Sequence, residues 1–101
     1  MIGPEPEDEP TVVEYDANDA RAFLAALPDA VAISVALVAV ALSEAVEKYP
    51  GRMHGPHEGL GVIYEEFIEF TSAVHANDRH QQRIEASHIA AMGTRFLLDV
   101  P

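Results

Sequence analysis

The sequence predicts an all-α protein, an antiparallel helical bundle that is completed by oligomerisation. Apolar residues recur at helical spacing along four segments, and no segment shows the apolar–polar alternation of a half-buried strand. Capping residues and stop signals fall between these segments, and the short connections favour antiparallel neighbours. With 101 residues the chain is long enough for one small domain, which alone buries only part of its surface.

Residues 1–15 are predicted to be an acidic, disordered tail. They carry five acids and no base, and three of the first ten residues are proline. Residues 11–15 are also compatible with a short extended lead-in. Residues 16–101 are then expected to form a single helical domain.

The first helix is predicted to begin near Asp16 or Asn18, which are both capping residue types, and to run to Leu27. Pro28 ends or kinks it. Asp29 is then a candidate cap for the next helix.

The second helix is expected to run from Asp29 to Lys48, before the stop signal Tyr-Pro-Gly at 49–51. Its longest apolar stretch, residues 30–42, is shorter than the roughly 18 residues of a spanning helix, so we expect a buried helix in a soluble cytoplasmic protein. It has two apolar stripes: Val31, Val35, Val38 and Leu42; and Ile33, Leu37 and Val40. Either a second copy of the chain or the first helix could cover the second stripe.

The third helix is predicted from about His57 to Ala76, after a loop at 51–56. At about 100° per residue its core stripe would be Leu60, Ile63, Phe67, Phe70 and Val74. Glu66 lies on the border of that stripe, Glu69 one turn further along, and Glu65 beyond it. No Lys or Arg on this helix relieves their repulsion. The acids form either a solvated face or a cation site.

The fourth helix is predicted from about Arg79 to Asp99, with Asn77 and Asp78 as candidate caps. Polar residues, rather than Leu or Ile, follow the middle of its inner face: Gln81, Glu85, His88 and Arg95. Buried polar groups are costly unless paired. They form either a structural network, such as Glu85–Arg95 or His88–Glu66, or a functional site. Antiparallel packing would bring Glu66 and Glu69 opposite Glu85 and His88, as a divalent-metal site.

These residues resemble a known family. Glu66-Phe-Ile-Glu69 followed by Glu85 is similar to the E-x-x-E … E-x-x-D signature of the MazG-like all-α nucleoside triphosphate pyrophosphohydrolases. The resemblance covers about residues 43–99 and is greatest to short phage-encoded members. It implies a four-helix core built from a dimer or higher oligomer, and hydrolysis of a nucleoside triphosphate to monophosphate and pyrophosphate. Glu66, Glu69 and Glu85 would be catalytic.

The implied cofactor is Mg²⁺ or Mn²⁺, held by Glu66, Glu69, Glu85 and His88, and Arg95 is assigned to substrate binding. The fourth position of the family signature is Asp, whereas this chain has His88. Mg²⁺ prefers oxygen ligands, so this substitution favours a softer metal, nucleotide binding without hydrolysis, or loss of the metal.

Two other classes of function remain open. A Glu with a Glu-x-x-His pair is the half-set of a ferritin-like carboxylate-bridged metal protein. A non-catalytic helical oligomer that binds a nucleotide or protein partner is the other. The net charge of −11 and the scattered bases argue against nucleic acid or an anionic membrane as partner, and the absence of cysteine excludes disulfides.

Overall fold

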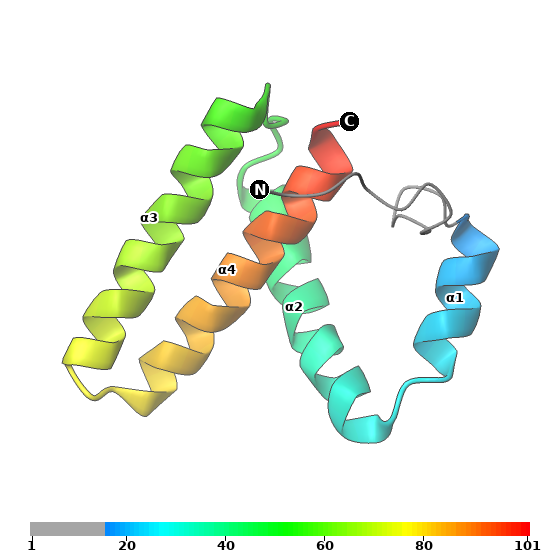
Figure 1. The fold of residues 1–101 in the computed structure, drawn as a ribbon, viewed down its shortest axis with the longest axis horizontal. Coiled ribbons are helices and arrows are strands. Elements are labelled where there is room, and N and C mark those ends of the chain that lie inside the picture. The colour runs from blue at the N-terminus through cyan, green and yellow to red at the C-terminus, as the bar shows by residue number, and fades with distance from the viewer. Residues whose placement is uncertain (1–15) are drawn as a thin grey trace, which may run out of the picture. The chain divides into compact units, whose positions relative to one another are not determined.

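The protein is all-helical over the residues that the structure, a computed structural model, describes, which are 16–101. The helices are α1 (Ala17–Ala25), α2 (Asp29–Lys48), α3 (Pro56–His75) and α4 (Arg79–Asp99), with no strand in this range (Figure 1). The predicted fold class is confirmed at this level. The expected tail and extended lead-in lie outside the described residues.

The helix boundaries follow the capping residues closely. Asp16 caps α1, accepting a hydrogen bond from the amide of Asp19 at 2.8 Å, and Asp19 returns the interaction as a capping box. α1 ends two residues before the predicted Leu27. The amides of Ala26 and Leu27 donate to the carbonyls of Phe23 and Leu24, which is the i to i−3 pattern of a 3₁₀ turn and not that of an α-helix. Asp29, expected as a cap, is instead the first residue of α2.

The chain divides into two compact units, Met1–Ala32 and Ile33–Pro101. Of the first unit the structure describes α1 and the first turn of α2. The second unit holds the rest of α2 together with α3 and α4, and it contains every candidate site residue.

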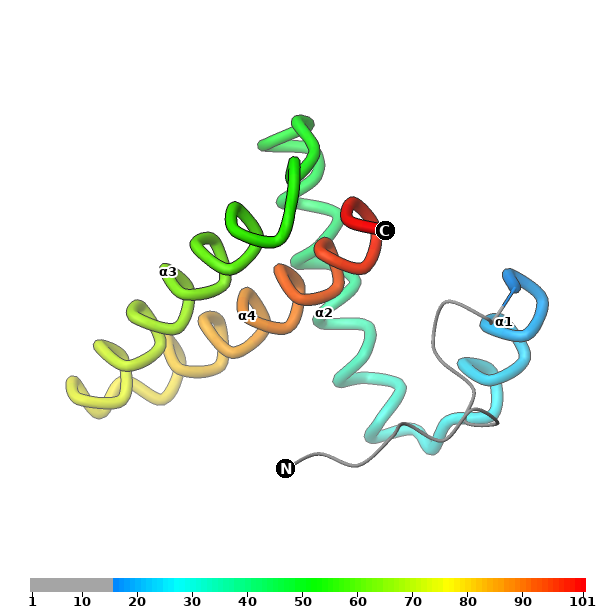
Figure 2. The backbone as a smooth tube through the Cα atoms, turned by 45° about the horizontal axis from the view of Figure 1, so that its top comes forward, coloured from blue at the N-terminus to red at the C-terminus, as the bar shows by residue number. Residues whose placement is uncertain are grey.

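α3 and α4 form an antiparallel hairpin, which Figures 1 and 2 show from two directions. Asn77 adopts the left-handed conformation with φ 53°, and the amides of Asn77 and Asp78 bond to the carbonyls of Val74 and Ala73. This is a Schellman motif, which suits Asn at that position. Asp78 then caps α4 through the amide of Gln81. Both predicted caps are therefore confirmed.

The packed face of α3 differs from the predicted stripe. Leu60, Phe67 and Val74 are 66%, 53% and 43% exposed, whereas Gly59 and Ala73 are buried against the rest of the unit. Small residues let α3 approach α4 closely, so the helix turns this side inward and leaves those three side chains outside. The other two residues of the predicted stripe, Ile63 and Phe70, are partly buried, and Ile63 packs against the core. Glu66, expected on the border, consequently lies in the middle of the packed face.

The core of the second unit is small. Met53, Ala91 and Met92 are buried, and four residues of α2 pack against them: Val38, Ala41, Leu42 and Ala45. No residue of α2 is itself buried, and Ile33, Leu37 and Val40 are 63%, 49% and 56% exposed. Within one chain α2 is therefore not buried, and its burial against a second copy stays a prediction.

α2 is also the one helix in the described range that is long and apolar enough to cross a membrane by length and composition. This is weak evidence, since the core helix of a soluble protein passes the same test. The cytoplasmic location stays a prediction.

Candidate metal centre

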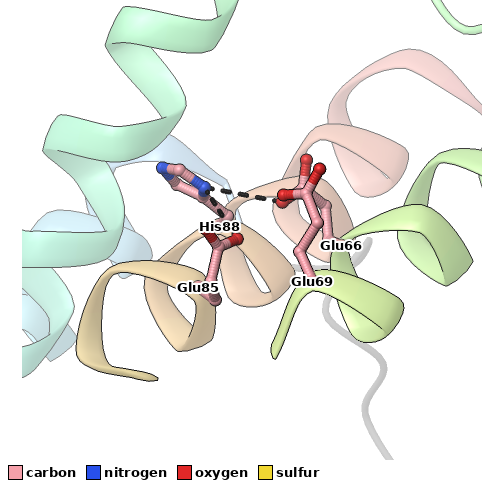
Figure 3. Close-up of side chains that lie close together, drawn as sticks. All are labelled: Glu66, Glu69, Glu85 and His88. Carbon is pink, nitrogen blue, oxygen red and sulfur yellow. Dashed lines mark ion pairs between the residues drawn. The ribbon is translucent and has the colours of Figure 1, made fainter. Parts of the chain in front are cut away.

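Four side chains from the α3–α4 hairpin converge at one place. Glu66 and Glu69 project from α3, and Glu85 and His88 from α4 (Figure 3). Each offers one ligand atom, and these atoms all lie within 4.8 Å of one another. Spacings of three residues on each helix put both members of each pair on one face. The hairpin thus brings together all four residues that the sequence predicted.

Two carboxylate oxygens of this cluster are buried without a hydrogen-bond partner, namely Oε2 of Glu66 and Oε2 of Glu85. Glu85 is only 6% exposed, and its Oε1 accepts a hydrogen bond from the side-chain nitrogen Nε2 of Gln81 at 2.6 Å. A buried carboxylate oxygen without a donor is costly. Both oxygens therefore require a positive partner.

His88 only partly meets that need. Its Nδ1 lies 3.4 Å from Oε2 of Glu85 and 3.5 Å from Oε2 of Glu66. These separations count as ion-pair distances, but they exceed those of good hydrogen bonds, and one N–H cannot serve both oxygens. The predicted His88–Glu66 contact exists, but it leaves the two carboxylates undersatisfied.

Glu69 is the exposed member of the cluster. The neighbouring carboxyl group of Glu85 raises the pKa of Glu69 above its ordinary value, and burial and the charge of Glu66 act in the same direction. The charge on His88 opposes them only weakly. Glu69 therefore retains its proton more readily than an isolated carboxyl group does, as expected where acids crowd together.

The donor set fits a divalent cation. Three carboxylates supply the oxygen ligands that Mg²⁺ and Mn²⁺ prefer, and one imidazole suits Mn²⁺ better than Mg²⁺. A bound cation would satisfy both buried oxygens at once. The residues present therefore fit the metal that the sequence implied.

A cleft of about 670 Å³ opens beside the cluster. The carboxylates of Glu65, Glu66 and Glu69 line it from α3, His88 from α4, and Lys48 from α2. This volume is within the range of small-molecule sites. Its charged side chains are mostly acidic, so an anionic ligand would enter only together with a cation.

Arg95, the predicted substrate-binding residue, borders the same cleft but is 6% exposed and engaged elsewhere. Nη1 donates to the carbonyl of Ala45 at 3.2 Å, and Nη2 donates to the carbonyls of Tyr49 and Gly51. Ala45 lies in the last turn of α2, and Tyr49 and Gly51 follow that turn, so the guanidinium sits at the C-terminal end of the helix, where a cation is favourable. The guanidinium thus fastens α2 to α4.

Asp99 completes this clamp, and sequence reasoning missed it. Its Oδ2 accepts from the amide of Met53 at 3.0 Å and from Nε of Arg95 at 3.3 Å, while its carbonyl accepts from Arg52. The Met53 amide, followed by Arg95, lowers the pKa of Asp99. The Arg95–Asp99 spacing of four residues was the signal in the sequence. The clamp replaces the predicted Glu85–Arg95 pair.

The remaining histidines lie apart from the cluster. His54 bonds through Nδ1 to Glu58 at 2.9 Å at the start of α3, where both side chains are exposed, and this contact contributes to lowering the pKa of Glu58. His75 and His80 are exposed beside the hairpin turn.

Comparisons of the chain with protein-family models, with curated proteins and with solved structures find no match. The class that the fold and site define is therefore an all-helical protein with a candidate Glu₃His metal centre. The resemblance to MazG-like enzymes stays a prediction from the motif.

Proposed function

We propose that this protein is a divalent-cation-dependent nucleoside triphosphate pyrophosphohydrolase. The observation that carries the proposal is the cluster of Glu66, Glu69, Glu85 and His88, whose ligand atoms lie within 4.8 Å and include two buried oxygens without a hydrogen bond. The motif resemblance supplies the type of reaction. The adjoining cleft supplies room for a substrate of nucleotide size.

The energetics favour a cation over a purely structural network. A network would leave each buried carboxylate paired, as Asp99 is paired with Arg95 and the Met53 amide. In the Glu66–Glu69–Glu85–His88 cluster, one imidazole is shared among three carboxylates. Its Nδ1 lies 3.4 Å from Glu85 and 3.5 Å from Glu66. The contrast between the two clusters of one hairpin supports a metal role for the first.

In the proposed reaction, the acidic residues of the cleft would bind the cation and Lys48 would bind phosphate. Glu66, Glu69 and Glu85 would hold the cation as carboxylates. The cation, when bound, neutralises phosphate charge and helps to position a water. Lys48 lines the same cleft from α2, and its ammonium group would contact phosphate oxygens of a bound substrate.

The test combines cation binding with turnover. We expect the full-length protein to bind Mn²⁺, measured by calorimetric titration, and to release pyrophosphate from at least one of the common nucleoside triphosphates. Glu66→Gln should abolish both, because it removes a ligand. Glu65→Gln is the matched control, since Glu65 is the neighbouring acid on the same helix but lies outside the cluster.

Different results separate the two parts of the proposal. Absence of cation binding by the folded protein would refute the metal centre and the activity with it. Cation binding without pyrophosphate release from any nucleoside triphosphate would refute the hydrolase and leave a non-catalytic metal protein.

A second candidate function has one observation in its favour. Glu66 with the Glu85-x-x-His88 pair, His88 Nδ1 facing the carboxylates, is the half-set of a dinuclear carboxylate-bridged centre. Two copies would have to join at this face to complete it. Two iron or manganese ions per two chains in the purified protein, without nucleotide turnover, would favour this reading.

A further inference from the structure

A second cleft of about 680 Å³ lies between α2 and α4 on the other side of His88. Its floor is apolar: Leu37, Val38, Val40 and Ala41 from α2, and Ile84 from α4. We call this the α2–α4 groove. The two helices meet where Arg95 binds Ala45, and they separate toward their N-terminal ends (Figures 1 and 2).

We propose that the α2–α4 groove is a homodimer interface, in which α2 of a second copy packs antiparallel to α2 of the first. This inference does not depend on the cation site.

The apolar side chains of the groove favour a protein occupant. Leu37 and Val40 are about half exposed, and Ile33 continues the same face of α2 at 63% exposure. Residues 30–43 of α2 carry no charge, whereas charged groups lie at the rim of the groove. An apolar centre with a polar rim is the usual anatomy of an interface between proteins.

Charge complementarity identifies the occupant as a second copy. Glu44 lies on the α2 wall, while His80 and Arg83 lie on the α4 wall toward its N-terminal end. An antiparallel pair of α2 helices with its axis between Val38 and Ala39 places Glu44 of one copy level with Ile33 of the other. Arg83 and His80 of α4 lie at that end of the groove. The same axis sets Leu37 against Val40 of the second copy.

A membrane is a poorer occupant of this face. Val38, Ala41, Leu42 and Ala45 of α2 already pack against the core, so the helix cannot be surrounded by lipid. Arg95 also fixes the end of α2 to α4, and the opposite wall carries Arg83 and His80. Such groups are costly in hydrocarbon.

α1 is too short to cover the whole exposed apolar face of α2. It has nine residues, or about 13 Å of helix, whereas the exposed face from Ile33 to Val46 extends over about 20 Å. Phe23 and Leu24 are its large exposed apolar side chains.

The first experiment measures the mass of the full chain in solution. Sedimentation at micromolar concentration should show a dimer, and Leu37→Glu should convert it to a monomer that keeps its helical circular dichroism. Leu97→Glu is the matched control, because Leu97 is an exposed leucine of the same unit that does not line the groove. A wild-type monomer in the absence of lipid would overturn the proposal.

The second experiment does not require a disruptive variant. The chain has no cysteine, so Val40→Cys provides a single thiol beside the proposed axis. A short bis-maleimide should link Val40→Cys into covalent dimers and should leave Leu97→Cys largely monomeric. Equal linking of the two variants would refute the antiparallel pairing. Flotation of the wild type with phosphatidylglycerol vesicles, and loss of flotation in Leu37→Glu, would show a membrane surface instead and overturn it.

Discussion

At the residue scale, the hairpin contains two polar clusters that differ in how fully they are satisfied. Arg95 meets Asp99 and three carbonyls, so the charges of that cluster are paired. Glu66 and Glu85 each keep a buried oxygen without a hydrogen bond. This difference indicates a structural role for the first cluster and supports the proposed cation-binding role of the second.

In the proposed metal centre, His88 would set the metal preference, because it is the one nitrogen ligand among three carboxylates. Replacing it in His88→Asp gives four carboxylates, and we expect Mg²⁺ affinity to rise by about tenfold, or about 1.4 kcal/mol. Because the His88 side chain is 41% exposed, the added charge should cost the metal-free protein only about 1 kcal/mol. Calorimetric titration with Mg²⁺ and Mn²⁺ measures the change. His88→Asn, which supplies oxygen without charge, is the control, and unchanged Mg²⁺ affinity in His88→Asp would contradict the assignment.

The clamp at Asp99 should appear in the acid stability of the protein. The lowered pKa of Asp99 means that its contribution is complete above the ordinary value near 3.9 and is lost as the pH falls through its folded value. Asp99→Asn cannot titrate. We therefore expect the difference in urea midpoint between wild type and Asp99→Asn to be constant above about pH 5 and to shrink below about pH 4. A difference that persists to pH 2 would show that charge at Asp99 is unimportant.

At the element scale, close approach of α3 to α4 depends on small residues. Gly59 lies against the ring of Phe96, and a Cβ at this position would stand 2.8 Å from Cε2 of that ring. Ala73 is 4% exposed further along the same face. These residues set the rotation of α3 and so place Glu66 inside.

Two glycines of α3 provide a paired test of this packing. Gly59→Ala should destabilise the protein by about 1–3 kcal/mol, because Phe96 must move. Gly61→Ala has nothing within 4 Å and should stabilise it by up to about 1 kcal/mol through helix propensity. Thermal unfolding should move the midpoint in opposite directions for the two variants. Stabilisation by both would show that the Gly59–Phe96 contact is loose.

The sequence predicted the four helices and the site better than it predicted packing. Asp16, Asn77 and Asp78 act locally, so their capping roles could be deduced from residue type. The cluster follows from i, i+3 spacing on two antiparallel helices. The rotation of α3 depends instead on a contact between Gly59 and Phe96, thirty-seven residues apart, which helical periodicity alone does not reveal. Arg95 was predicted to bind substrate, because its partners are backbone carbonyls at the end of α2 and just after it, which residue type does not reveal.

At the scale of the whole molecule, the second unit is an incomplete bundle. Its buried apolar core consists of Met53, Ala73, Ala91 and Met92, while large apolar side chains of α2 and α3 remain exposed. A small core supplies little net stability for a domain of this size. Association would bury the exposed faces. His88 and Glu44 line both clefts, so an occupant of the α2–α4 groove would contact a side chain of the proposed metal centre.

The proposed dimer and the proposed metal centre should therefore be coupled. A second copy seated in the groove lies beside His88 and restricts its imidazole, whose Nδ1 faces Glu66 and Glu85 on the other side. Restriction before binding lowers the cost of recruiting His88 as a ligand. We expect Mn²⁺ to tighten the dimer by about fivefold or more, and dimerisation to tighten Mn²⁺ binding by the same factor, as linkage requires.

Sedimentation equilibrium with Mn²⁺ and with EDTA measures the first factor, and titration of Leu37→Glu measures the second. Glu66→Gln should remove the effect of Mn²⁺ on the dimer while leaving the dimer itself intact. Equal dimer affinity with Mn²⁺ and with EDTA would show that the groove and the metal centre act independently.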